Sequence, residues 1–192
     1  VDAEGVQDMG LFDKFKKKNV ESANKKTETT VETKPDDTFE CTLDHLYGEL
    51  ANTIISTIPM EWEEFHYLGE VESGKCSWSS VFFVKRSQDE KYIKCFDLDG
   101  FNGQCSDAID SVLLKIYDCF VQNNHKAWEQ MCISVKNTGD FKVNFKYDVM
   151  AKAEYGQVER EIIWAYETFG GRPHNSPFLE SILERYLAKK NG

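Results

Sequence analysis

Apolar side chains recur at the period of an α-helix in four segments of the chain. Thr42 is the predicted N-cap of the first segment, and Pro59 ends it because proline disfavours helical geometry at Ile58. Ser106 is the predicted cap of the second segment, and Gly170 is the predicted stop of the third. The sequence therefore predicts helices over residues 42–58, 106–122, 154–168 and 177–190.

Five other segments show the shorter period or the aromatic and β-branched composition of β-strands. Short turns join the first three and the last two, so both groups are expected to pair antiparallel. In the last segment, apolar residues from Phe141 to Tyr147 alternate with Lys142, Asn144 and Lys146, which predicts one solvated face. The predicted strands cover residues 65–72, 77–85, 91–98, 131–136 and 141–148.

The order of these elements, α-β-β-β-α-β-β-α-α, is typical of an α+β fold. We expect a single domain over residues 41–192, built on one antiparallel sheet of about five strands with helices packed on one face. The chain is 41% hydrophobic, which is enough to form a core.

The residues before this domain are expected to lie outside the fold. Residues 1–8 precede Met9-Gly10 and are interpreted as an expression remnant. Residues 9–40 form a polar tail with few apolar side chains, which predicts disorder. Residues 10–18 combine three large apolar side chains with four lysines, a composition that allows weak contact with an anionic membrane. A plain solvated tail is the simpler interpretation.

The cysteines and the hydropathy pattern indicate a cytoplasmic protein. No apolar run reaches the length of a membrane span, and no secretory signal is visible. The six cysteines contain no CxxC pair, so reduced thiols are expected rather than a disulfide framework or a zinc site. No cofactor or metal is predicted.

Negative charge is concentrated in one part of the chain. The net charge is −10, and residues 41–118 alone carry fourteen acidic and six basic side chains. An acidic surface repels nucleic acid and attracts basic partners, so direct nucleic-acid binding is not expected. A simple contribution to solubility also explains such a charge.

The first candidate site is Trp62 with its neighbours Glu61, Glu63 and Glu64. An aromatic anchor beside carboxylates is a common composition for binding a basic protein surface. The alternative interpretation is a core tryptophan at a helix-to-strand corner, surrounded by solvated acids.

The second candidate site is a group of four aspartates, Asp97, Asp99, Asp107 and Asp110, around the glycine-containing residues 100–103. Their spacing does not match a calcium-binding loop. They suit an acidic loop that faces a partner, and they equally suit helix capping and loop polarity. No nucleophile elbow, phosphate loop or paired-histidine motif is present, and we predict that the protein is not an enzyme.

Several collinear segments carry a family resemblance. Leu46-Tyr47-Gly48-Glu49-Leu50-Ala51-Asn52, followed by Ile58-Pro59-Met60-Glu61-Trp62-Glu63, resembles the pattern LYGEIAN…IPxEWE that opens the YezG-like immunity proteins. Further similarity lies in residues 109–120, in the hairpin 139–148, in Gly156-Gln157-Val158-Glu159-Arg160 and in Phe169-Gly170. The similarity spans about residues 41–171, although Lys146 stands where the family pattern has an acid.

This resemblance implies a bacterial antitoxin. Proteins of this kind bind a secreted polymorphic toxin inside the producing cell, commonly a nuclease of the LXG or type VII secretion kind. Nuclease toxins are basic because they hold phosphates, and an acidic inhibitor is complementary to them. The eight residues of the two candidate sites are accordingly the predicted toxin-binding residues. Two alternatives stay open: a metal-dependent hydrolase that uses these carboxylates, and a non-catalytic adaptor tethered by its basic tail.

Overall fold

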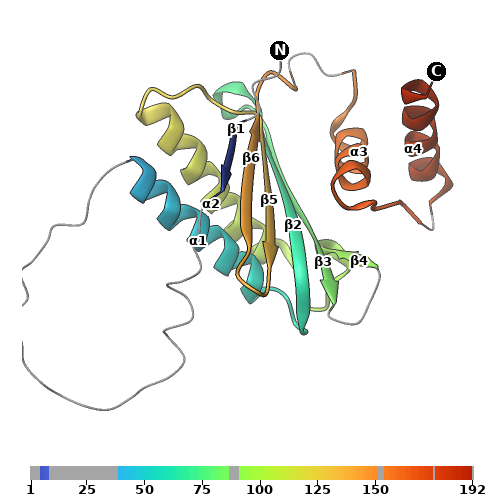
Figure 1. Cartoon of the computed structure of the whole chain (residues 1–192), viewed down its shortest axis with the longest axis horizontal. Coiled ribbons are helices and arrows are strands. Elements are labelled where there is room, and N and C mark those ends of the chain that lie inside the picture. Colours follow the sequence, from blue (N-terminus) through green and yellow to red (C-terminus); the bar gives the residue numbers. More distant parts are fainter. Residues whose placement is uncertain (1–4, 9–38, 87–90, 151–153, 175, 192) are drawn as a thin grey trace, which may run out of the picture.

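The computed structural model describes residues 5–8, 39–86, 91–150, 154–174 and 176–191 (Figure 1). Residues 10–18 and nearly all of the predicted tail, up to residue 38, lie outside the described residues. None of the described helices is both long and apolar enough to cross a membrane.

One antiparallel sheet forms the centre of the molecule, with the strand order β1-β6-β5-β2-β3-β4 (Figure 1). This confirms the predicted α+β class and the predicted order of five strands. A sixth strand, β1, lies in the segment that was interpreted as a remnant, and it pairs with the edge of β6. The strands are β1 (Gly5–Asp8), β2 (Trp62–Val71), β3 (Trp78–Arg86), β4 (Tyr92–Lys94), β5 (Gln130–Lys136) and β6 (Phe141–Lys146).

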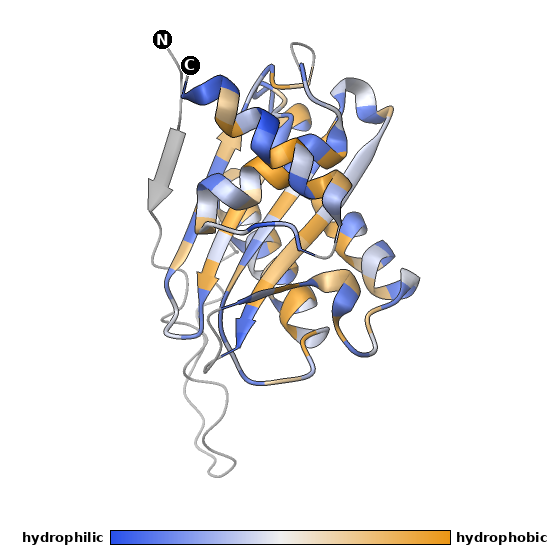
Figure 2. Ribbon diagram, turned by 90° about the vertical axis from the view of Figure 1, so that its right-hand side faces the viewer, coloured by the Kyte–Doolittle hydropathy of each residue, from blue (hydrophilic) through white to orange (hydrophobic). Residues whose placement is uncertain are grey.

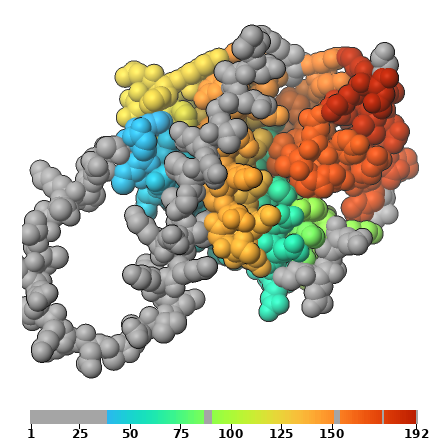
Figure 3. Space-filling model, in the orientation of Figure 1, coloured from blue at the N-terminus to red at the C-terminus, as the bar shows by residue number. Residues whose placement is uncertain are grey.

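Helices cover both faces of the sheet, where the sequence predicted one covered face. Helices α1 and α2 pack on one face, and α3 lies against the other, with α4 on its outer side (Figures 1 and 3). The rings of Phe83 in β3 and Trp164 in α3 lie 6.1 Å apart. The helices are α1 (Phe39–Ser56), α2 (Gly103–Gln122), α3 (Gln157–Phe169) and α4 (Pro177–Lys190).

The main core lies between the sheet and helices α1 and α2. Hydrophobic residues recur along the strands of the sheet (Figure 2). Tyr47, Phe65, Tyr67 and Leu113 are among its fully buried side chains. Gly69 in β2 lets α2 approach closely, because a Cβ atom there would lie 2.5 Å from the Leu113 Cδ1 atom. A smaller cluster, formed by Ile162, Ile182 and Leu183, joins α3 to α4.

The two predicted helix caps were wrong, whereas the predicted helix ends lie close to the observed ones. Thr42 lies inside α1, which already begins at Phe39. Asn102, not Ser106, caps α2: its side-chain oxygen accepts hydrogen bonds from the N–H groups of Gln104 and Cys105 at 2.9 and 3.3 Å. α1 ends at Ser56, two residues before the predicted end at Ile58, and Gly170 ends α3 in the left-handed conformation with φ 71°.

The third predicted strand is much shorter than expected. It was predicted over residues 91–98, but β4 ends at Lys94 and a short 3₁₀ turn, Cys95–Asp97, follows. Most of the outer edge of β3 is consequently left without a strand in the described part of the chain.

Candidate protein-binding surface

The two predicted acidic groups lie toward opposite ends of β2. Trp62 begins this strand, whereas Asp110 borders a hollow that is also lined by Leu68 and Glu70 near its end. At about 3.3 Å per strand residue, Trp62 and Leu68 lie roughly 20 Å apart along β2. The structure therefore does not combine them into one site.

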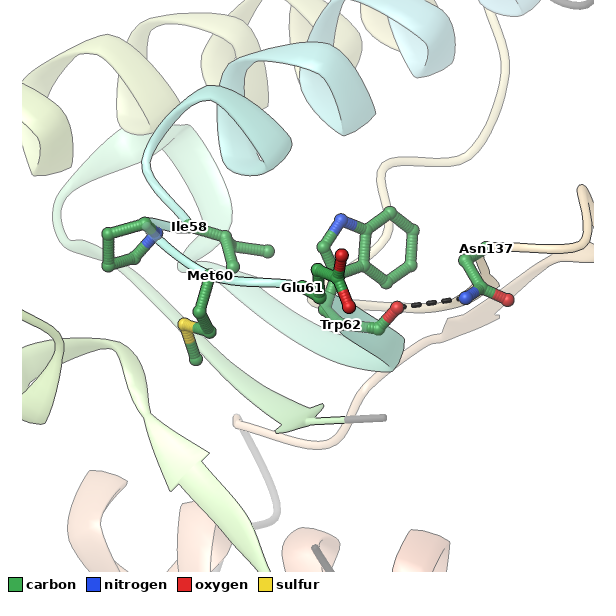
Figure 4. A pocket seen from close by; sticks show the side chains of 6 residues that line it. Ile58, Met60, Glu61, Trp62 and Asn137 are labelled. Atoms are coloured by element: carbon green, nitrogen blue, oxygen red, sulfur yellow. Dashed lines mark hydrogen bonds between the residues drawn. The ribbon is translucent and has the colours of Figure 1, made fainter. Parts of the chain in front are cut away.

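Trp62 is half-buried against the core (Figure 4). Its ring lies 5.5 Å from that of Phe65, and its carbonyl oxygen accepts a hydrogen bond from Asn137 Nδ2 at 2.9 Å. An open depression of about 580 Å³ lies beside it, with Ile58, Met60 and Glu61 in its lining. This placement matches the interpretation of Trp62 as a core residue at a helix-to-strand corner.

The carboxylates around Trp62 are mostly engaged within the fold. Glu63 forms an ion pair with Lys85 at 3.3 Å, and Glu64 accepts a hydrogen bond from the Tyr92 hydroxyl. Among the described residues, Glu61 alone of this group has no ion-pair or hydrogen-bond partner, and it is exposed. The first group therefore presents less free negative charge than its sequence suggests.

Glu64 belongs to a polar network under the end of α3. His66 Nδ1 lies 2.8 Å from Ser134 Oγ, and His66 Nε2 lies 3.3 Å from the Tyr92 hydroxyl oxygen. The imidazole stacks on Phe169 with 5.0 Å between ring centres. Burial lowers the pKa of His66, against the opposing effect of Glu64. This network joins β2, β4, β5 and α3, which gives Glu64 a structural role.

The second group keeps its charge exposed. Asp97, Asp99 and Asp107 are exposed, and none of them has an ion-pair or hydrogen-bond partner among the described residues. They are not needed as helix caps, because Asn102 caps α2. Asp110 differs from them: it is half-buried, and its Oδ1 atom is fully enclosed without a hydrogen-bond partner in the described part of the structure.

A hollow of about 200 Å³ lies between this group, β3 and α3. Asp110 lines this hollow together with Phe96, which is 58% exposed. Trp78, at the start of β3, is also exposed, at 47%. Exposed aromatics beside carboxylates are typical of protein-binding surfaces. Sequence reasoning missed both aromatics because their positions read as ordinary strand residues. The other lining residues are Leu68, Glu70, Ser79, Ser80, Val81, Ser106, Gln157 and Glu161.

The described residues contain no group of three or more His, Cys, Asp or Glu side chains placed to hold a metal ion. The convergence of carboxylates that a metal-dependent hydrolase requires is thus not found in this part of the chain. The six cysteines are free thiols, and burial raises the pKa of Cys95 and of Cys132 to about 11.

Comparison with known proteins shows the family of the chain. Residues 43–182 match the family model of the YezG-like immunity proteins. The chain belongs to this family. The match confirms the resemblance seen in the sequence and extends it into α4. A YezG-like chain is an immunity protein and not an enzyme.

Three curated relatives agree with the YezG-like assignment. The chain is 22% identical over 154 residues to immunity protein YezG of Bacillus spizizenii, covering 77% of this chain and 94% of that protein. It is 27% identical over 161 residues to the type VII secretion system protein EsaG of Staphylococcus aureus, covering 78% and 96%. It is 24% identical over 145 residues to immunity protein YezG of Bacillus subtilis, covering 72% and 93%.

One YezG-like segment, Gly156 to Arg160, explains how α3 is held on the sheet. Arg160 Nε and Nη2 donate to the two carboxylate oxygens of Glu70, each at 2.8 Å. Gln130 Nε2 also donates to Glu70, at 2.7 Å, and Arg160 Nη1 donates to the Tyr155 carbonyl oxygen at 2.9 Å. A bidentate pair of this kind fixes the angle and the position of the helix.

Proposed function

We propose that this immunity protein binds a cognate secreted toxin inside the producing cell and blocks its activity. Membership of the YezG-like family supports this role. The Staphylococcus aureus relative is named as a type VII secretion system protein, which supports a toxin exported by that route. The proposed partner is a protein, and no cofactor is needed for binding.

We further propose that the toxin is a basic nuclease and that it binds at Asp97, Asp99 and Asp107. The observation that carries this choice is the exposure of the three carboxylates without any cation paired to them in the described residues. A nuclease presents Lys and Arg side chains to the phosphates of its substrate. Carboxylates on a binding protein can occupy the same positions and accelerate association.

The neighbouring aromatics would supply the apolar part of such an interface. Phe96 directly precedes Asp97, and its ring is among the most exposed large apolar side chains of the described residues. Burial of an aromatic ring at the centre of an interface commonly gives more binding free energy than the surrounding charges. Of the first group, Glu61 alone offers comparable free charge, so the Asp97 region is the stronger candidate.

Co-expression with the toxin domain encoded by the adjacent gene tests the function. A tag on the immunity protein should recover both chains in one complex, and the recovered toxin should show no nuclease activity. Separation of the two chains under denaturing conditions, followed by refolding of the toxin alone, should restore nuclease activity. Recovery of the immunity protein alone, with an active toxin in the same lysate, would contradict the proposal.

A further inference from the structure

The outer edge of the sheet is only partly covered. β4 pairs with Phe83, Val84 and Lys85 of β3, and no strand of the described residues lies beyond them along that edge. Residues 78–81 of β3 therefore form an open strand edge about 13 Å long. An open edge presents backbone N–H and C=O groups that can pair with another strand.

The backbone groups that point outward can be identified from the pairing of β2. The Val71 N–H donates to the Glu129 carbonyl oxygen at 3.0 Å, on the β5 side of the strand. In antiparallel strands the N–H and C=O groups of successive residues point to opposite sides. The backbone N–H and C=O groups of Glu70 therefore point toward its partner Ser79 in β3. By the same alternation, the N–H and C=O groups of Ser80 point away from the sheet.

The inner end of this open edge is covered by the turn that follows β4. Phe82 is buried beside the 3₁₀ turn Cys95–Asp97, which contacts β3 after β4 ends. Ser80 lies beyond this point and lines the 200 Å³ hollow. Asp110, whose enclosed Oδ1 atom has no partner in the described structure, lines the same hollow. The hollow thus places the open strand edge next to the carboxylate of Asp110.

The charge around the hollow indicates what would occupy it. Asp97 and Asp107 directly follow Phe96 and Ser106, which line the hollow, and both aspartates are exposed without a paired cation in the described residues. An incoming strand that carries Lys or Arg side chains would be attracted here, and one that carries acids would be repelled.

We propose that an extended, Lys- and Arg-bearing segment of the toxin pairs with residues 78–81 of β3 and adds a strand to the sheet. Main-chain hydrogen bonds to Trp78 and Ser80 would supply affinity, and the aspartates would select a basic segment. This inference rests on the proposed function, since the segment belongs to the toxin.

Amide hydrogen exchange tests the pairing at single residues. Exchange is measured by NMR on the full chain, free and in complex with the toxin domain encoded by the adjacent gene. In the free chain, the amides of Ser79 and Val81 should be protected by β2, whereas that of Ser80 should exchange fast. In the complex, exchange at Ser80 and Trp78 should slow by about tenfold or more.

Two substitutions at one position test the contribution of the backbone N–H. Ser80→Ala and Ser80→Pro both remove the hydroxyl that lies 2.9 Å from the Tyr67 hydroxyl, but only proline removes the N–H. We expect Ser80→Pro to bind the toxin domain about tenfold more weakly than Ser80→Ala. If Ser80→Pro fails to fold, the exchange measurement on the unaltered chain still decides.

The outcomes separate this inference from the proposed function. A stable, inhibited complex without slower exchange at Ser80 would overturn the strand pairing and leave the immunity function intact. Absence of any complex would overturn both. A third outcome is that, without toxin, protection of the Ser80 amide rises with the concentration of the chain. This would show that a second copy of the chain pairs with the edge, and it would overturn pairing with the toxin.

Discussion

Arg160 attaches α3 to the sheet through its ion pair with Glu70. Its side chain is 14% exposed and that of Glu70 is 2% exposed, so the pair is shielded from water. Replacing Arg160 with Met leaves a buried carboxylate without its cation, and we expect a loss of about 3 kcal/mol in unfolding free energy. Urea denaturation of purified protein measures this loss.

Arg185 provides the matched control. It pairs with Glu159 at 3.1 Å, but its side chain is 67% exposed, so Arg185→Ala should cost less than about 1 kcal/mol. If Arg160→Met and Arg185→Ala lose the same amount of unfolding free energy, the ion pair with Glu70 does not anchor α3.

His66 should make stability depend on pH. Burial lowers its pKa in the folded state, so the unfolded chain binds a proton first as pH falls below about 6.5. The stability that neutral His66 contributes is complete above this pH and declines below it. Urea midpoints between pH 7.5 and 5 should therefore fall less in His66→Gln than in the unaltered protein.

His45, which is exposed on α1, serves as the control position. His45→Gln should retain the pH dependence of the unaltered protein. If the stability of His66→Gln depends on pH as strongly as that of His45→Gln, then His66 is not the source of the pH dependence.

At the scale of single elements, the first prediction concerns the residue that caps α2. The Asn102 side chain accepts two hydrogen bonds from the first turn, whereas the predicted cap, Ser106, lies inside the helix. Asn102→Ala should lower the unfolding free energy by about 1 kcal/mol, and Ser106→Ala should change it by less than about 0.5 kcal/mol. Thermal and urea unfolding of both variants measure this contrast, and the reverse order would restore Ser106 as the cap.

The close contact between β2 and α2 leads to a second prediction at this scale. A Cβ at Gly69 would also lie 2.8 Å from the Tyr67 hydroxyl oxygen, and both Tyr67 and Leu113 are fully buried. Gly69→Ala should therefore destabilise the protein by about 2 kcal/mol through overpacking. Gly103→Ala is the control, because nothing lies within 4 Å of its Cβ position. A Gly69→Ala variant as stable as Gly103→Ala would contradict close packing here.

The elements themselves could largely be predicted from the sequence. Helical stripes and the alternation from Phe141 onward are local patterns, and they gave the right element order. The N-caps could not be predicted reliably. Several polar residues precede each helical segment, and the path of the backbone determines which of them is the cap. The second covered face could not be predicted. His66 and Glu70 look solvent-facing in sequence, but Ser134 and Arg160, far along the chain, satisfy them in the interior.

For the whole molecule, the fold decides which acids remain free. Lys85 neutralises Glu63, and Tyr92 holds Glu64, although neither partner is adjacent in sequence. The sequence could predict both groups of acids and the family, but not this difference between them. Nor could it predict the open edge of β3, which results from the early end of β4 at Lys94.

The choice of binding surface leads to one whole-molecule prediction about charge. Reversal of Asp97, Asp99 and Asp107 to Lys should slow association with the toxin by about tenfold or more at low salt. Reversal of Glu40, Asp140 and Glu180 changes the net charge by the same amount, on exposed residues away from the hollow. The first variant should lose most of the salt dependence of association, and the second should keep it.

The association rate constant with the toxin domain, measured at two ionic strengths for the unaltered protein and these two variants, tests the central claim most directly. We expect fast, salt-sensitive association for the unaltered protein and for the control reversal, and slow, salt-insensitive association for the reversal of Asp97, Asp99 and Asp107. Equal rate constants and equal salt dependence for the two reversals would contradict toxin binding at this acidic surface.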